Sequence, residues 1–532
     1  MSQVNSDVSR GCQTARVNLS VSPQRPERRR TVLEDAAYRL DAVAVALFAA
    51  VVSALGAGRP SLWFDEAATI SASHNRSLGE LWRMLANIDA VHGLYYLIMH
   101  GWFAVFPPTE FWSRLPSCLA IGVAAAGVVV LGNQLSGRTT AAAAGVAFAI
   151  LPRITWAGIE ARSYAMATAA AVWLTVLAVT AARRDRYNLW AVYTVALALG
   201  TLLNIFVGLM ILVHAVAVWS VADRRFRRTT VRRWGVAALG AAVVAAPFAY
   251  FAQTQIAQVR WIATPHLGNI LDIAFVQYFD HSVPFAIVAV VVLAAPWALH
   301  RRFDTQQLRL IVVASAWIAL PTAMLVLYSL VRDPVYYPRY LCFTSPALAL
   351  LLGVCITVIA RCKEVAVAIL MVFALAATPN YLGRQRGPYA KEGMDFSQVA
   401  DVIAAHARAG DCLILDNTTN WKPGPIRPIT AARSSVYANL VDPGRGRRAA
   451  DRNTLWDAHL GIWGVADQVR RCTVLWTVSQ RDASRPDHES GVRLDPGPRL
   501  GRAPAYRVPE RMGFHLVERW QFSFAQVTKS AR

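Results

Sequence analysis

The sequence predicts an α-helical protein that crosses a membrane many times and carries a small α/β domain at its C-terminal end. Hydrophobic residues make up 55% of the 532 residues and charged residues only 16%, with a mean hydropathy of +0.34, which is too apolar for an ordinary soluble protein. Apolar runs fill 38–381, whereas 385–532 is mixed and polar. Much of the net charge of +21 lies in short arginine clusters between apolar runs. It therefore indicates orientation in a bilayer rather than nucleic-acid binding.

The membrane spans can be counted because each needs about 20 predominantly apolar residues. About eleven segments meet this description: 38–57, 115–133, 139–157, 163–182, 189–203, 205–222, 234–253, 283–299, 308–330, 340–360 and 363–381. The first run starts too late for a cleaved signal peptide and is expected to be an uncleaved anchor. The basic segment before it, 1–37, is expected to be disordered and cytoplasmic, followed by a transmembrane core over 38–384.

Arginine-rich loops predict the orientation of these spans. With eleven spans, all of them fall on one face, which is then cytoplasmic: the segment before the first span, 183–186, 223–233, 300–303 and 361–363. This parity requires the apolar stretch 93–106, which is too short to cross, to lie along the interface as a helix. The first loop, 59–114, and the C-terminal domain, 385–532, are then extracytoplasmic.

Carboxylates and arginines gather on this predicted outer face. The first loop contributes Asp65, Glu66, Asp89, His92 and His100, and the later outer segments contribute Glu160, Arg162, Tyr164, Arg339 and Tyr340. Carboxylates suit a general base or a metal ion, and the planar fork of arginine binds phosphate oxygens in pairs. The combination fits a lipid-phosphate substrate that is attacked by a hydroxyl group.

Each of these groups also has a structural interpretation. An Asp-Glu pair just after a span suits a solvated loop or a helix cap, and Arg162 and Arg339 suit interfacial anchors that reach lipid headgroups. The tryptophans of the first loop suit an aromatic belt. His92 and His100 suit one helix face, where a zinc pair and ordinary packing are both open. Composition alone leads to a polytopic protein with an outward acidic and basic site.

Five motifs in order resemble one class of enzyme: "WFDEA" (63–67), "DAVHGLYYLIMHGW" (89–102), "FWSRLPS" (111–117), "EARSYAMA" (160–167) and "YYPRYL" (336–341). They resemble the membrane glycosyltransferases of the GT-C class. The similar families are the dolichyl-phosphate-mannose protein mannosyltransferases, the lipid A aminoarabinose transferases and the actinobacterial mannosyltransferase-like proteins. The resemblance covers 38–381 in order and, more loosely, 395–415.

The resemblance implies transfer of a sugar from a polyprenyl phosphate to a glycan, lipid or protein of the cell envelope. It places Asp65 as the catalytic base with Glu66 beside it, and Asp89 and His92 at a second acidic or histidine position. Arg162 and Arg339 are expected to contact the donor phosphate. The expected supporting residues are Glu160, Tyr164 and Tyr340. Many relatives have His-Pro-Pro-Leu where this chain has His92-Gly93-Leu94, which changes how stiffly His92 is presented.

The implied chemistry is a single displacement at the anomeric carbon, which inverts its configuration. Asp65 takes the proton of the acceptor hydroxyl, and the two arginines stabilise charge on the departing phosphate. No Walker or dinucleotide glycine motif is found, and the donor carries its own energy, so no nucleotide is expected. A divalent metal bound by carboxylate and histidine stays open, as does the sugar: mannose, arabinofuranose, galactose or another.

Two other functions compete with this hypothesis. A transporter or lipid flippase predicts ionisable residues near the bilayer midplane and a repeat of spans. The spans contain few charged residues and no obvious repeat, and the acidic pair lies in a loop. A non-catalytic GT-C relative is the second alternative, for which Asp65 would be dispensable.

The tail, 385–532, is of ordinary size for one small domain. The apolar spacing of 396–408 predicts a helix, and 410–417 and 472–479 predict buried strands. Cys412 and Cys472 are its two cysteines, and either a disulfide or two buried free thiols would fit. The domain is expected to help bind the acceptor or to cap the membrane core.

Overall fold

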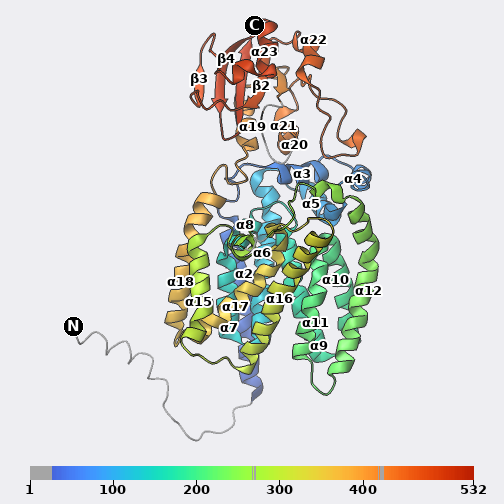
Figure 1. The fold of residues 1–532 in the computed structure, drawn as a ribbon, viewed down its shortest axis with the longest axis vertical. Coiled ribbons are helices and arrows are strands. Elements are labelled where there is room, and N and C mark those ends of the chain that lie inside the picture. Colours follow the sequence, from blue (N-terminus) through green and yellow to red (C-terminus); the bar gives the residue numbers. More distant parts are fainter. Residues whose placement is uncertain (1–26, 267, 269–270, 417–418, 420–424) are drawn as a thin grey trace, which may run out of the picture.

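The computed structural model describes residues 27–266, 268, 271–416, 419 and 425–532, and shows a helical bundle beneath a smaller domain (Figure 1). The first 26 residues of the expected disordered segment lie outside this range. The rest of that segment differs from the expectation, because helix α2 (Glu27–Ala54) begins at Glu27 rather than after residue 37.

The bundle is built from helices joined by short connections. Its members after α2 are α6 (Glu110–Leu135), α7 (Arg138–Ile150), α8 (Pro152–Gly158), α9 (Tyr164–Arg184), α10 (Tyr187–Leu203), α11 (Met210–Val221), α12 (Arg227–Thr254), α14 (Gln277–Phe279), α15 (Val283–Ala298), α16 (Thr305–Val331), α17 (Ser345–Ile359) and α18 (Lys363–Pro379). Short 3₁₀ or π-helical segments adjoin four of them: η2 (Ile205–Leu209), η4 (Asp272–Val276), η5 (Pro338–Thr344) and η6 (Asn380–Gln385).

Among the described residues, seven helices are long and apolar enough to cross a membrane, or nine if each of two bent pairs counts as one span. The bent pairs are α7 with α8, at 61°, and the segment Asp272–Phe279 with α15, at 107°. Two shorter apolar helices, Tyr187–Leu203 and Ile205–Val221, fall on the expected tight pair. The multi-pass helical fold is confirmed, and the count of eleven stays a prediction.

The surface and the packing of the bundle both suit lipid. Large apolar side chains such as Leu47, Val243 and Leu375 point outward with most of their area exposed, which water would oppose. Small residues let the helices approach closely. A Cβ on Gly122 of α6 would lie 2.8 Å from the carbonyl oxygen of Ala46 in α2. The basic loops that follow α9, α11, α15 and α17 lie at the end of the bundle away from the smaller domain (Figure 1).

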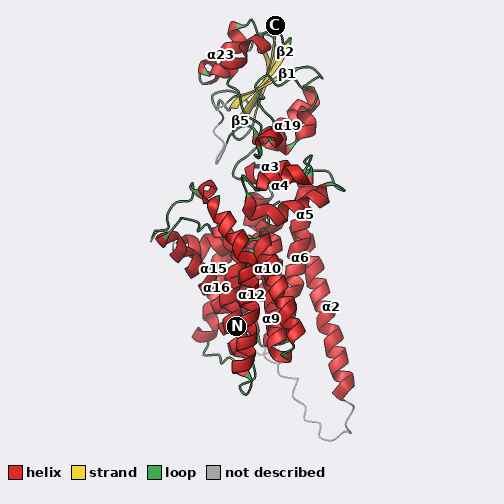
Figure 2. Ribbon diagram, turned by 90° about the vertical axis from the view of Figure 1, so that its right-hand side faces the viewer, coloured by secondary structure: helices red, strands yellow, loops and turns green. Residues whose placement is uncertain are grey.

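Three helices of the first loop lie between the bundle and the smaller domain: α3 (Phe64–Ser73), α4 (Leu78–Leu85) and α5 (Gly93–Phe103) (Figure 2). Helix α4 begins with a capping box in which Ser77 and Glu80 bond to each other's backbone N–H. Helix α5 coincides with the stretch expected to lie along the interface. This layer carries the residues of the first predicted motif.

The C-terminal domain contains a five-stranded sheet in the order β1-β2-β5-β4-β3, with β1 and β2 parallel and the other pairs antiparallel. The strands are β1 (Cys412–Leu415), β2 (Val474–Gln480), β3 (His488–Ser490), β4 (His515–Gln521) and β5 (Ala525–Ala531). Helix α19 (Phe396–His406), β1 and β2 fall on the expected helix and strands, whereas the β3–β5 strands have no counterpart in the expectations. The α/β character of the domain is confirmed.

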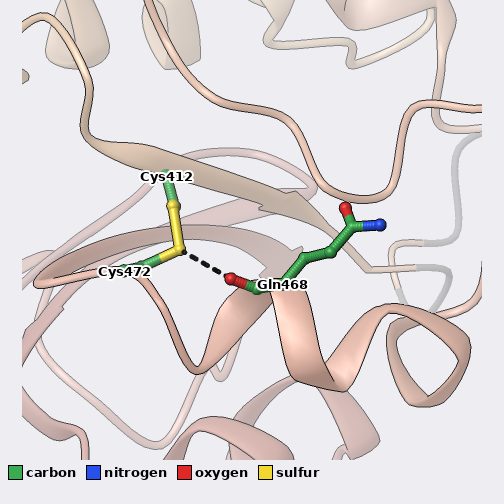
Figure 3. Close-up of a disulfide and its surroundings, with 3 residues drawn as sticks. All are labelled: Cys412, Gln468 and Cys472. Carbon is green, nitrogen blue, oxygen red and sulfur yellow. Dashed lines mark hydrogen bonds between the residues drawn. A yellow bond between two sulfur atoms is a disulfide. The ribbon is translucent and has the colours of Figure 1, made fainter.

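A disulfide joins Cys412 at the start of β1 to Cys472 just before β2 (Figure 3). Their Cα atoms are 6.0 Å apart, and the Sγ atom of Cys472 lies 3.6 Å from the carbonyl oxygen of Gln468. The bond ties together the two parallel strands. Four other described cysteines are free: Cys118, Cys342, Cys355 and Cys362.

One apolar core joins the first-loop helices to the C-terminal domain. It includes Trp63 and Ala67 from the loop and Phe396 and Ile403 from α19. Polar contacts fix the same interface: Glu110, at the start of α6, accepts hydrogen bonds from Ser397 and Arg433 of the C-terminal domain. The domain is therefore packed on the layer that carries Asp65.

Candidate active site

Asp65 lies in the first turn of α3, between two arginines that come from distant parts of the chain. Arg162, in the loop before α9, places Nη2 3.2 Å from one carboxylate oxygen, and Arg339 of η5 places Nη2 3.3 Å from the other. Burial by itself raises the pKa of Asp65, but the two guanidinium groups outweigh it and hold that pKa below its usual value. Asp65 is therefore ionised at neutral pH, between two positively charged side chains.

Arg162 is held by a short chain of hydrogen bonds. Its Nη1 donates to the hydroxyl of Tyr96 at 2.8 Å, and that hydroxyl donates to Asp89 at 2.7 Å. Burial keeps the pKa of Tyr96 well above its usual value, so the phenol stays protonated. Asp89 has a left-handed φ of 61°, and the backbone N–H groups around it donate to Gln255 and Gln258. Asp89, at the second predicted acidic position, therefore holds Arg162 through the hydroxyl of Tyr96.

Aromatic rings hold Arg339 in place. Its guanidinium carbon lies 5.2 Å from the ring centre of Trp63 and 4.8 Å from that of Tyr337. Behind it, the rings of Tyr164, Tyr340 and Phe206 form a stack with centres 6.3 and 5.5 Å apart. The two tyrosines expected to support the site therefore form one of its walls. The Nε atoms of both Arg162 and Arg339 are buried and lack a partner in the described part of the chain.

A cavity of about 620 Å³, here called the site cavity, opens beside these groups. Asp65, Asp89, His92, Arg162 and Arg339 line its polar end. The rest of its wall is largely apolar and comes from η2, α12, α16 and neighbouring segments: Ile205, Phe206, Leu209, Ala249, Ala252, Ile256, Val259, Trp261, Met324, Leu325 and Val335. An apolar wall ending in two arginines matches a long hydrocarbon chain that carries an anionic head.

His92 lies at the same end of the cavity. Its ring centre is 5.7 Å from that of Tyr96, and its Nδ1 is buried with no partner among the described residues. Burial, and then the positive charge of Arg162, lower the pKa of His92 to about 4, so the imidazole is neutral at neutral pH. His100 is separate from it, because its Nδ1 contacts the carbonyl oxygen of Ser73 at 3.0 Å.

Glu66 is adjacent to Asp65 in sequence but does not line the cavity. Arg114 of α6 donates to both of its oxygens, from Nε at 2.7 Å and from Nη2 at 2.5 Å, and both side chains are fully buried. The backbone N–H of Ala161 donates to the same carboxylate at 3.2 Å. Glu66 is therefore paired within the protein interior, outside the cavity that Asp65 lines.

Glu160 lies behind the site, where it links Trp63 to the C-terminal part of the chain. It accepts a hydrogen bond from the Trp63 indole at 2.6 Å and pairs with Lys391 at 2.9 Å. Burial raises the pKa of Glu160 and lowers the pKa of Lys391, because neither charge is solvated there. Glu160 thus holds the indole on which Arg339 rests.

Four side chains that contribute to the site were not singled out from the sequence. Arg114 and Tyr96 lie within two of the five motifs, but the motifs assigned them no role. Lys391 and Trp456 lie in the tail, where no motif marks them, although Trp456 lines the cavity and packs 5.4 Å from Phe64. In the described part of the chain, no three His, Cys, Asp or Glu side chains gather as metal ligands would.

The fold is similar to that of solved GT-C membrane glycosyltransferases, the class that the five motifs resemble. Among solved structures, the chain is similar to ArnT from Cupriavidus metallidurans in the apo state, with 14% identity and a TM-score of 0.54 over 93% of this chain and 98% of that chain. It is also similar to the same protein bound to undecaprenyl phosphate, with 15% identity and a TM-score of 0.52 over 95% and 98%. No protein-family model matches the sequence, and no curated protein matches it either.

Proposed function

We propose that the chain is a membrane glycosyltransferase that moves a sugar from a polyprenyl-phosphate donor to an acceptor outside the cytoplasm. The observation that carries this proposal is Asp65, held between Arg162 and Arg339 at the polar end of a cavity whose other walls are apolar. The likeness of the fold to ArnT bound to undecaprenyl phosphate supports the same kind of donor.

In the proposed reaction the donor phosphate binds Arg162 and Arg339, whose buried Nε atoms have no described partner. The phosphate then competes with Asp65 for both guanidinium groups. This weakens the hold on the carboxylate and raises its pKa towards the range of a useful base. Asp65 takes the proton of the acceptor hydroxyl, whose oxygen displaces the phosphate from the anomeric carbon with inversion. The arginines stabilise the departing phosphate, an effect worth about 2.7–4 kcal/mol per well-placed donor.

The other predicted residues receive supporting roles in this proposal. His92, neutral and facing the cavity, contacts the sugar or the phosphate. Asp89 and Tyr96 position Arg162, and Glu160 positions Trp63. Glu66 is assigned a structural role, since Arg114 occupies both of its oxygens.

We also propose that the C-terminal domain is extracytoplasmic. The Cys412–Cys472 disulfide supports this, because such bonds persist in oxidising compartments. The basic loops at the opposite end of the bundle support it as well. The sugar and the acceptor are left open, with mannose one candidate among several.

The test is sugar transfer in membranes that contain the full chain, with a panel of radiolabelled polyprenyl-phosphate sugars. One donor is expected to give a labelled product that Asp65→Asn abolishes at equal expression. Asp467→Asn, the same change at an exposed position of the C-terminal domain, is expected to keep full activity. Equal activity of wild type and Asp65→Asn would show that Asp65 is not the base. Movement of intact donor across the membrane of vesicles that contain the chain, without transfer of its sugar, would instead favour the flippase alternative.

A further inference from the structure

A second hollow, here called the upper cleft, lies between the end of α3 and the C-terminal domain. Its volume is about 530 Å³. Residues from 70–76 line one side and residues from 427–457 line the other. Leu455 and Trp456 line both this cleft and the site cavity, so the two hollows meet at these side chains.

Arg76 gives the cleft a charged donor that the protein does not satisfy. Its side chain donates from Nε to the carbonyl oxygen of Ser71 and from Nη2 to that of Thr454, each at 2.6 Å. The residue is only 7% exposed, yet its Nη1 has no hydrogen-bond partner within the described chain. No carboxylate of the described residues pairs with it. A buried charged donor left open costs free energy unless a ligand fills it, so this arrangement points to an anionic ligand.

The other charged side chains that line the cleft also leave it with an excess of positive charge. Arg427 pairs with Asp442, and Arg445 pairs with Asp457 at 2.6 Å, so these four lining residues cancel each other. Arg448 also lines the cleft, but its side chain is 62% exposed and its contact to Asp451 is long, at 3.7 Å. The lining residues therefore carry an excess of two positive charges, from Arg76 and Arg448, which the nearby carboxylate of Glu80, outside the lining, offsets only in part.

The walls of the cleft favour a carbohydrate over a lipid. None of its lining residues belongs to a membrane-spanning helix, whereas α12 and α16 line the site cavity. A ligand thus enters from the aqueous side rather than from the bilayer. Trp456 offers an aromatic surface to a sugar ring, and Tyr437, which also lines the cleft, has a buried hydroxyl with no described partner. Polar groups set among aromatic faces suit a glycan.

We propose that the upper cleft binds an anionic glycan, which is the acceptor of the transferred sugar. This inference rests on the proposed function. Arg76 holds an acidic group of the glycan, and the accepting sugar reaches Asp65 past Trp456. Helix α3 joins the two hollows, because Asp65 lines the site cavity, Ser71 lines the upper cleft, and the two residues are about 9 Å apart along the helix axis. The Ser71 hydroxyl donates to the carbonyl oxygen of Leu455, which fixes the wall between the two hollows.

The test measures binding to the purified full chain in detergent by isothermal titration calorimetry. The probe is tetragalacturonate, and its methyl ester is a control that differs in charge. Wild type is expected to bind the acid and to bind the ester much more weakly. Arg76→Gln is expected to weaken binding of the acid about tenfold to a hundredfold, as loss of a charge-assisted hydrogen bond does. Arg448→Gln, at the exposed rim, is expected to weaken it a few-fold.

Two controls keep the result decisive. Arg470→Gln, an exposed arginine of the same domain outside the cleft, is expected to leave affinity unchanged. Thermal unfolding separates lost binding from lost folding in Arg76→Gln, and Arg448→Gln tests the cleft without touching a buried side chain. Absence of tetragalacturonate binding, equal binding of acid and ester, or competition by phosphatidylglycerol vesicles would each overturn the proposal. Because the readout is binding, it stands apart from the Asp65 assay, whose failure would leave a glycan site without the transfer.

Discussion

The two sides of helix α3 put adjacent carboxylates to different uses. Asp65 faces the site cavity and makes single contacts of 3.2 and 3.3 Å to two arginines. Glu66 faces the protein interior, where Arg114 grips both of its oxygens at 2.7 and 2.5 Å. Charge-assisted hydrogen bonds are normally about 2.7–2.9 Å long, so the Asp65 contacts are loose and the Glu66 pair is tight.

This comparison teaches how a structural and a chemical carboxylate differ within one motif. The Glu66 pair is saturated: Arg114 also donates to the carbonyl oxygens of Ala57, Pro60 and Ser61, and nothing is left to exchange with a substrate. The arginines around Asp65 keep buried nitrogens without described partners. In the proposed reaction an incoming phosphate uses those nitrogens and releases Asp65. The predictions below test this difference.

The largest effect is expected on stability, from Glu66→Gln. The change leaves the fully buried guanidinium of Arg114 without its counter-charge, which costs about 3–5 kcal/mol when one partner of a buried pair is removed. The measurement is the midpoint of thermal unfolding in detergent, which should drop strongly. Asp65→Asn should move it far less, because Asp65 lies at a cavity wall and its contacts are long.

A double variant sharpens this prediction. Glu66→Leu with Arg114→Met removes both charges, and part of the lost stability should return, although three backbone carbonyls then lose their donor. If Glu66→Gln unfolds at the same temperature as wild type but loses all sugar transfer, Glu66 belongs to the chemistry and the comparison fails.

The next effect is expected on the pH dependence of Arg162→Gln. In the proposed reaction transfer needs ionised Asp65, so activity should be lost as the pH falls through the pKa of Asp65. Arg162 helps to hold that pKa below its usual value, and its removal raises the pKa. The acid limb of the pH–rate profile should therefore move to higher pH. Activity on the plateau should drop about a hundredfold to a thousandfold, because the phosphate loses one donor.

Arg470→Gln serves as the control for this profile, since its exposed side chain pairs with Asp467 far from the cavity. Its acid limb should coincide with that of wild type. An acid limb that stays in place in Arg162→Gln would mean that another group sets it, and Asp65 would lose its role as the base.

Much of the fold follows from the sequence because it depends on local composition. Long apolar runs specify spanning helices wherever they occur, and two short apolar runs predicted the buried strands β1 and β2. Strands β3–β5 were not expected, since the polar residues of β3 and β4 carry little strand signal on their own. The start of α2 inside the basic segment was also missed.

The site was predictable in part for a different reason. Asp65, Arg162 and Arg339 are linked by charge complementarity, and the motifs mark all three residues even at large sequence separation. The roles of Glu66 and Lys391 depend on which side chain faces them, and no local pattern encodes that. Lys391 reaches Glu160 across 231 positions, so only the folded chain reveals the pair.

The smallest effect is expected from Trp63→Phe. This variant tests whether Glu160, behind the site, positions Arg339 through the Trp63 indole. Phenylalanine keeps a ring beneath Arg339 but loses the hydrogen bond from the indole to Glu160. Such a bond contributes about 0.5–1.5 kcal/mol, so kcat/KM should fall a few-fold, mainly through KM for the donor. Trp63→Leu also removes the aromatic face beneath the guanidinium, a contact worth up to about 2 kcal/mol when desolvated. Its kcat/KM should therefore fall further. Equal losses in the two variants would show that Arg339 does not depend on the ring. In that case Glu160 and Lys391 would stabilise the fold without positioning the cation that receives the phosphate.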